Sequence, residues 1–164
     1  MEGNWSGIGF NDAAAGLKAQ SQFNAHTKAC AKDKITPDVT VYNAGYRKGL
    51  VKFCTTTNGY QYGANKSEYY GVCPGTAQKN FLKGYLAGLD TAYAELTDEI
   101  VDLRYKRLRA ISRHHRFNHH KEPDKKKIKH WSDRIDSLEN RIDSRRDEHR
   151  ELRRWHQFWS AKLK

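Results

Sequence analysis

The residues best suited to chemistry are clustered histidines in the C-terminal half of the chain. Four of them occur within seven residues, His114, His115, His119 and His120. On a helix, pairs four or five residues apart could hold a metal ion. The nearby lysines, Lys121 and Lys125 to Lys127, would repel a dication. The favoured interpretation is therefore a solvated polar segment that gains positive charge in mild acid.

Catalytic constellations are missing from the sequence pattern. There is no serine in a nucleophile elbow and no glycine-rich phosphate loop. Asp98, Glu99 and Asp102 form an acidic cluster, but an exposed helix face commonly shows the same spacing. We therefore expect a protein that is not an enzyme and needs no cofactor.

Three cysteines are present, and none lies in a CxxC pair, which argues against a zinc or thioredoxin-type site. Cys54 and Cys73 flank a segment rich in Thr, Asn, Gly and Tyr. A disulfide between them is one interpretation, and it would stabilise the fold by roughly 3 kcal/mol. The alternative is a set of free thiols in a cytosolic protein. With a Cys54–Cys73 bond, Cys30 is left over among the three cysteines.

Positive charge is concentrated in one segment. Residues 1–103 carry ten basic and ten acidic side chains, whereas residues 104–130 carry eleven basic and two acidic ones. Such a segment attracts anions. The predicted polyanion-binding residues are Arg113, Arg116, Lys121, Lys125, Lys126, Lys127 and Lys129. The alternative is a charged helix face without a partner.

Nucleic acid is the rival partner for this basic segment. A pI of about 9.6 fits it. However, no zinc-finger, helix-turn-helix or RNA-recognition signature accompanies the charge, and acidic residues between Asp133 and Glu151 dilute it. Nucleic acid is thus the less favoured partner.

The N-terminal half contains four pairs of small residues at a spacing of four, each with an aromatic residue after its first glycine. They are Gly9 and Ala13, Gly45 and Gly49, Gly59 and Gly63, and Gly84 and Gly88. On a helix each pair makes a flat patch that a second backbone can approach. The spacing predicts a weak internal repeat of short, tightly crossed helices. Turns or strands containing Tyr60, Tyr62, Tyr69 and Tyr70 are the alternative.

One of these helices has a predicted start. Thr36 fits an N-cap, and Pro37 fits the first turn, where its missing N–H costs nothing. The helix then runs to about Phe53.

From about Thr76 the apolar residues follow the three-and-four alternation of a coiled-coil seam. A first run is Leu89, Tyr93, Leu96, Ile100 and Leu103; a second is Ile128, Trp131, Ile135, Leu138 and Ile142, resuming with Leu152, Trp155 and Trp159. Helix-breaking residues lie between the two runs. Two helices of about 40 residues would form an antiparallel hairpin about 60 Å long. Arg145 and His149 occupy apolar slots of the second run.

The first 90 residues resemble a known family. The resemblance rests on Asn4-Trp5, Ile8-Gly9, Asp12, Gly16, residues 25–30, Pro37-Asp38, residues 42–45, Gly49-Leu50, Cys54, residues 70–74 and residues 81–88. This succession is similar to the bacterial envelope lipoproteins grouped as domain of unknown function family 2799. Members often have Asp-Gly where this chain has Asp12-Ala13.

The resemblance implies a location and no reaction. It implies export through a lipoprotein signal and an outer-membrane anchor on an acylated cysteine upstream of Met1. It also implies that Cys54 pairs with Cys73, while Cys30 pairs with a cysteine preceding Asn4-Trp5. We therefore expect a periplasmic protein anchored to the outer membrane.

The predicted fold is all-α, with an N-terminal bundle of short Gly-crossed helices over 1–90 and a basic antiparallel helical hairpin over 91–164, turning near 117–125. The predicted function is a non-catalytic binding or structural role in the envelope. The expected partner is an anionic lipid, lipopolysaccharide or another envelope protein, with nucleic-acid binding as the alternative. Self-association through the hairpin is expected if residues such as Trp131, Trp155, Phe158 and Trp159 are exposed.

Overall fold

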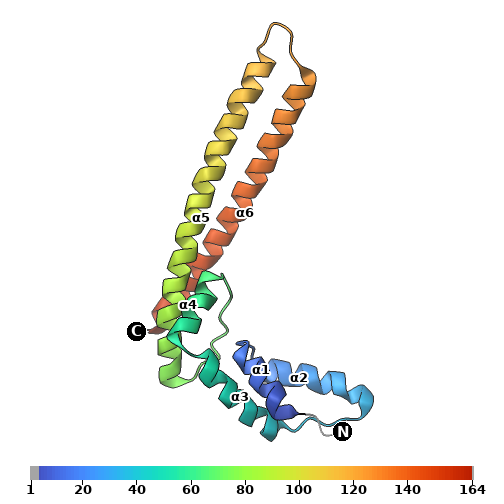
Figure 1. The fold of residues 1–164 in the computed structure, drawn as a ribbon, viewed down its shortest axis with the longest axis vertical. Coiled ribbons are helices and arrows are strands. Elements are labelled where there is room, and N and C mark those ends of the chain that lie inside the picture. Colours follow the sequence, from blue (N-terminus) through green and yellow to red (C-terminus); the bar gives the residue numbers. More distant parts are fainter. Residues whose placement is uncertain (1–3, 164) are drawn as a thin grey trace. The chain divides into compact units, whose positions relative to one another are not determined.

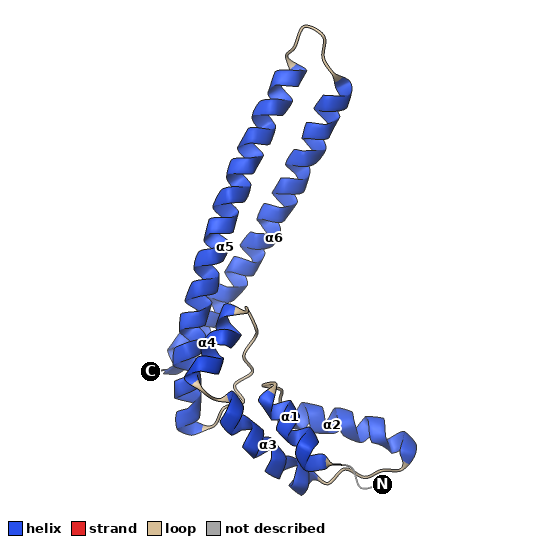
Figure 2. Cartoon of the chain, in the orientation of Figure 1, coloured by secondary structure: helices blue, strands red, loops and turns tan. Residues whose placement is uncertain are grey.

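The structure of the chain is a computed structural model that describes residues 4–163 (Figure 1). These residues form helices joined by loops and contain no strand (Figure 2). In chain order the helices are α1 (Trp5–Ala14), α2 (Ala19–Cys30), the 3-10 helix η1 (Ala31–Asp33), α3 (Val39–Phe53), α4 (Thr56–Ala64), α5 (Gly75–Asn118) and α6 (Lys125–Leu163). The predicted all-α fold is confirmed. Of the tyrosines in the alternative, Tyr60 and Tyr62 lie in α4, whereas Tyr69 and Tyr70 lie in the loop after it, so the strands are wrong and a loop is present. No helix of the described part is long and apolar enough to cross a membrane.

The described chain forms two compact units. The N-terminal unit holds the residues up to Asp90 together with those from Phe158 onward. The hairpin unit holds Thr91–Gln157. Both α5 and α6 therefore contribute residues to each unit.

In the N-terminal unit, α1 and α3 cross through glycines. A Cβ atom on Gly9 would overlap the backbone carbonyl of Tyr42, and one on Gly45 would overlap the carbonyl of Ser6. Gly49 lies against α1 in the same way. The two backbones are thus in direct contact, which a residue with a side chain would not allow at these positions.

The helices α4 and α5 also cross with glycines at the contact, so that their backbones touch. A Cβ atom on Gly59 would overlap the carbonyl of Phe81, and one on Gly84 would overlap the carbonyl of Thr56. In both crossings the hydroxyl of a tyrosine on the second helix donates a hydrogen bond to a backbone carbonyl in the loop that follows the first helix. These bonds run from Tyr46 to Leu17 and from Tyr85 to Ser67. The repeated unit is therefore a pair of crossed helices, and each copy uses two of the four small-residue pairs.

The disulfide and an aromatic cluster complete this unit. Cys54 and Cys73 are bonded, with their Cα atoms 5.6 Å apart, and the bond closes the segment that contains α4. Tyr69 lies in the loop inside that segment. The centroid of its ring lies 4.5 Å from that of Phe81 and 4.7 Å from that of Trp159. Trp159, expected in the hairpin seam, is instead buried in the core of the N-terminal unit.

The N-terminus of α3 differs from the prediction. The N-cap is Asp38, whose Oδ1 accepts hydrogen bonds from the N–H groups of Thr40 (2.8 Å) and Val41 (3.0 Å). Thr36 and Pro37 precede the helix. A carboxylate that satisfies two free N–H groups at once makes Asp38 the better cap.

In the hairpin unit, α5 and α6 run side by side in opposite directions and are joined by a turn after Asn118 (Figure 1). The buried seam consists of Leu96, Ile100, Leu103 and Ala110 of α5 with Leu138, Ile142 and Leu152 of α6. Side-chain packing, with no glycine in the seam, joins these two helices.

Polar contacts replace apolar ones where the seam pattern is interrupted. Arg145 lies 3.0 Å from Glu99 of the opposite helix and 2.7 Å from Glu148, and these carboxylates raise the pKa of its guanidinium. The ring of His149 lies 3.8 Å from that of Tyr93. Tyr93 was predicted to be a seam residue, but it is 37% exposed and packs against this polar ring in place of an apolar side chain.

Candidate functional site

The candidate site begins with the tip of the hairpin, where α5 ends and α6 starts. Asp124 caps α6, because its Oδ1 accepts a hydrogen bond of 3.1 Å from the N–H of Lys127. That bond and the Lys127 ammonium, which lies 3.0 Å from the carboxylate, lower the pKa of Asp124. Pro123 just before the cap cannot continue a helix from α5. The turn is therefore defined by its own residues.

All seven cations predicted to bind a polyanion are exposed at this tip: Arg113, Arg116, Lys121, Lys125, Lys126, Lys127 and Lys129. Two of them form ion pairs, Lys127 with Asp124 and Lys129 with Asp133. Arg113 lies over the ring of Trp131, 5.2 Å from its centroid.

The other four cations have no carboxylate partner among residues 4–163, namely Arg116, Lys121, Lys125 and Lys126. Their charges face solvent without compensation. An anion that approached them would not have to displace an internal partner. The tip is therefore chemically suited to hold phosphate or carboxylate groups.

The histidine cluster adds to the tip without forming a metal centre. The rings of His115 and His119 lie 4.2 Å apart. The Nδ1 atom of His120 lies 3.4 Å from the N–H of Glu122. Within the described residues, no group of three or more His, Cys, Asp or Glu side chains could hold a metal ion. His115 and His119 lie within the segment that carries the exposed cations.

Two of the three residues of the acidic cluster predicted on α5 form ion pairs. Glu99 pairs with Arg145, and Asp102 pairs with Lys106 of the same helix. Both carboxylates are about half exposed or less, with side-chain exposures of 37% and 52%. Their role in the structure is to bind cations of the hairpin itself.

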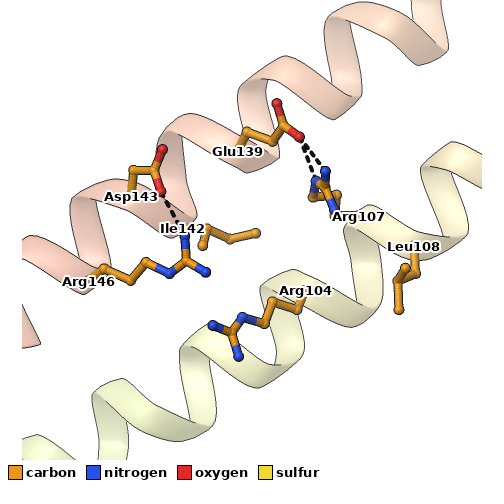
Figure 3. Close-up of a pocket in the computed structure, with 7 residues that line it drawn as sticks. All are labelled: Arg104, Arg107, Leu108, Glu139, Ile142, Asp143 and Arg146. Carbon is orange, nitrogen blue, oxygen red and sulfur yellow. Dashed lines mark hydrogen bonds and ion pairs between the residues drawn. The ribbon is translucent and has the colours of Figure 1, made fainter.

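A groove in the hairpin unit was not predicted from the sequence. Its volume is about 400 Å³, and it is lined by Arg104, Arg107, Leu108, Glu139, Ile142, Asp143 and Arg146 (Figure 3). Arg107 bonds Glu139 through its Nε at 2.7 Å, and Arg146 bonds Asp143 at 3.1 Å. Arg104 has no carboxylate partner within residues 4–163 and extends from α5 along the groove. The groove thus carries one uncompensated guanidinium.

The N-terminal unit contains a second polar cluster that sequence reasoning missed. Asp12 accepts a hydrogen bond of 2.7 Å from the hydroxyl of Tyr42, and the Nε2 atom of His26 lies 2.9 Å from the same carboxylate. Burial is the main cause that raises the pKa of the Tyr42 hydroxyl, and the hydrogen bond to Asp12 is the second cause. The three residues come from α1, α2 and α3. The cluster therefore ties α2 to the first crossing.

Comparison with known proteins bears on the N-terminal part of the chain. A family model described as Protein of unknown function (DUF2799) matches residues 4–90. No curated protein and no solved structure gives a match. The matched range covers both helix crossings and ends where the hairpin unit begins.

Proposed function

Because this chain belongs to the family described as Protein of unknown function (DUF2799), we propose its function from the chemistry of its hairpin. The protein is a non-catalytic binding or structural component of the bacterial envelope, and its basic tip holds an anionic polymer or surface. The observation that carries this proposal is the set of exposed, uncompensated cations Arg116, Lys121, Lys125 and Lys126.

The proposed location is the periplasm, with an outer-membrane anchor upstream of the described residues. The Cys54–Cys73 bond supports this location, because disulfides persist in oxidising compartments and are rare in the cytosol. Anionic lipids, lipopolysaccharide and acidic partner proteins are the polyanions that such a compartment offers. Each basic side chain near an anionic membrane surface contributes about 1 kcal/mol of attraction.

The test reverses three charges at the tip. Lys125, Lys126 and Lys127 are changed together to Glu, which also suits the N-terminus of α6 because carboxylates stabilise a helix start. We expect binding to anionic vesicles and to lipopolysaccharide, measured by sedimentation, to fall by at least about a hundredfold. Circular dichroism checks that the helices are retained.

The matched control makes the same change in net charge in the other unit. Arg47, Lys48 and Lys52 are exposed cations of α3, and all three are changed to Glu. The control should bind as the unchanged protein does. If both variants lost the same amount of binding, the loss would be due to the change in net charge, and this result would contradict a site specific to the tip. A stronger, salt-dependent shift of nucleic acid in a gel would favour the alternative function.

A further inference from the structure

The helix α5 has a second apolar face whose side chains stay largely exposed among the described residues. Val101, Tyr105, Leu108 and Ile111 are 58%, 60%, 61% and 36% exposed. Their spacing of four, three and three places them on one side of the helix. Leu103, on the opposite side, is 1% exposed and belongs to the seam. In this part of α5 one apolar face holds α6, and the other, here called the outer stripe, faces solvent.

Basic side chains border the outer stripe. Arg104 and Arg109 project on either side of it, by their positions on the helix. The guanidinium of Arg109 lies 5.9 Å from the centroid of the Tyr105 ring. The nearest acidic residue on this helix, Asp102, is paired with Lys106. The border of the stripe is therefore positive.

The groove of Figure 3 continues the outer stripe. Leu108 belongs to both, since it lines the groove and is also one of the four exposed apolar residues. Arg104, the guanidinium without a carboxylate partner, lies in the same groove. Apolar surface and an available cation thus meet at one place on the hairpin.

A second copy of the chain and a water-soluble polymer both fit this arrangement poorly. A second copy of the hairpin would bring a second set of arginines against Arg104 and Arg109, and like charges repel. A water-soluble anionic polymer would satisfy the cations but would leave the apolar side chains uncovered. An anionic bilayer offers phosphate groups to the arginines and hydrocarbon to the stripe at the same time.

We propose that the outer stripe, with Arg104 and Arg109, docks onto an anionic phospholipid bilayer. The apolar side chains enter the boundary between headgroups and acyl chains, and the guanidinium groups bind lipid phosphates. This inference rests on the proposed function, because it selects a phospholipid surface from the polyanions that the basic tip could hold.

The experiment compares vesicles of phosphatidylethanolamine and phosphatidylglycerol with vesicles of phosphatidylcholine alone. The stripe variant carries Tyr105→Ser and Leu108→Ser. We expect it to lose about a hundredfold in binding to the anionic vesicles, at roughly tenfold for each side chain. The matched control is Val51→Ser, because Val51 is 79% exposed in the other unit. This control should bind normally.

Insertion is measured separately with the Tyr105→Trp variant. The chain already contains four tryptophans, so the emission of the unchanged protein is subtracted under the same conditions. The remaining emission, from the indole at position 105, should shift to the blue on anionic vesicles and should be quenched by lipids brominated in the acyl chain. An unshifted, unquenched emission on bound vesicles would show that the stripe stays in water, and the inference would be wrong.

Other outcomes separate this inference from the proposed function. If the stripe variant binds vesicles normally while the Lys125, Lys126 and Lys127 variant does not, the docking proposal fails and the tip proposal stands. If the unchanged protein binds lipopolysaccharide but no phospholipid vesicle, the docking proposal again fails and the tip proposal again stands. If it binds no anion at all, both fail. A dimer that Leu108→Ser dissociates in sedimentation velocity would assign the stripe to a second copy and overturn the inference.

Discussion

The two units join their helices by opposite means. In the N-terminal unit the crossings depend on the lack of a side chain, since Gly45 and Gly84 place backbone against backbone. In the hairpin unit the contact depends on side chains, since Leu103 and Leu138 fill the space between helices. Adding atoms should therefore damage the first unit, whereas removing atoms should damage the second.

The largest effect is expected from adding one methyl group to a crossing. Helix propensity alone predicts that Gly45→Ala stabilises α3 by about 1 kcal/mol. The new Cβ, however, would overlap the carbonyl of Ser6, and backbone atoms cannot move aside as a flexible side chain can. We expect a net loss of about 4 kcal/mol, measured as the free energy of unfolding in urea.

Lys48→Ala is the control for this prediction, because it introduces the same residue at an exposed position of α3. It should change the free energy of unfolding by less than about 0.5 kcal/mol. If Gly45→Ala were as stable as the unchanged protein, direct backbone contact would not be what holds the crossing together.

The hairpin should respond to the reverse change. Leu138 is 1% exposed and packs with Leu103, Ala110 and Ile142. Leu138→Ala removes this packing and should lower the free energy of unfolding by about 2.5 kcal/mol. This loss is near the lower end for buried leucines, because two helices can move together and partly close the cavity. A loss under about 1 kcal/mol would mean that the seam contributes little to holding α5 and α6 together.

An effect that is smaller for each residue should distinguish the units at alkaline pH. Burial raises the pKa of Tyr42 and of Tyr85, both of which are fully buried in the N-terminal unit. An unfolded tyrosine has a pKa of about 10. Because the folded pKa is higher, the stability is complete below pH 10 and falls as the pH rises above it, by about 1.4 kcal/mol per pH unit for each tyrosine.

Phenolate absorbance followed together with circular dichroism tests this pH dependence. The absorbance of the buried tyrosines should appear only as the helices unfold. Tyr85→Phe should make the fall of stability with pH less steep, although it loses the 2.9 Å bond to the Ser67 carbonyl. An unchanged slope would show that this phenol is not kept neutral by the fold.

Several of these features could be predicted from the sequence because they depend on local rules. Glycines spaced by four leave a flat patch on a helix that a second backbone can approach, and a dense block of basic residues marks an exposed, solvated segment. The choice of crossing partners could not be predicted. Gly9 meets α3 and Gly59 meets α5, and the spacing within each pair is the same for either partner.

The unpredicted sites combine residues that are distant in the sequence. Asp12, His26 and Tyr42 all stand at positions that carry the family resemblance, but they meet only after three helices have packed, and their spacing in the sequence does not show that they touch. The groove requires Arg104 of α5 to face Arg146 of α6, which depends on the register of the hairpin. Charge counts revealed the basic tip because its residues lie close together in the sequence. The same counts could not reveal the register of α5 against α6.

The smallest predicted effect concerns an ion pair that spans the hairpin. Arg107 and Glu139 are joined across the seam, yet their side chains are 36% and 44% exposed. Water screens such a pair, so a double-mutant cycle with Arg107→Ala and Glu139→Ala should give a coupling energy of only about 0.5 kcal/mol. Coupling above about 2 kcal/mol would make ionic contacts, along with apolar packing, a main determinant of the register. Because the same register brings Arg104 and Arg146 into one groove, such a result would also imply that salt weakens the groove together with the hairpin.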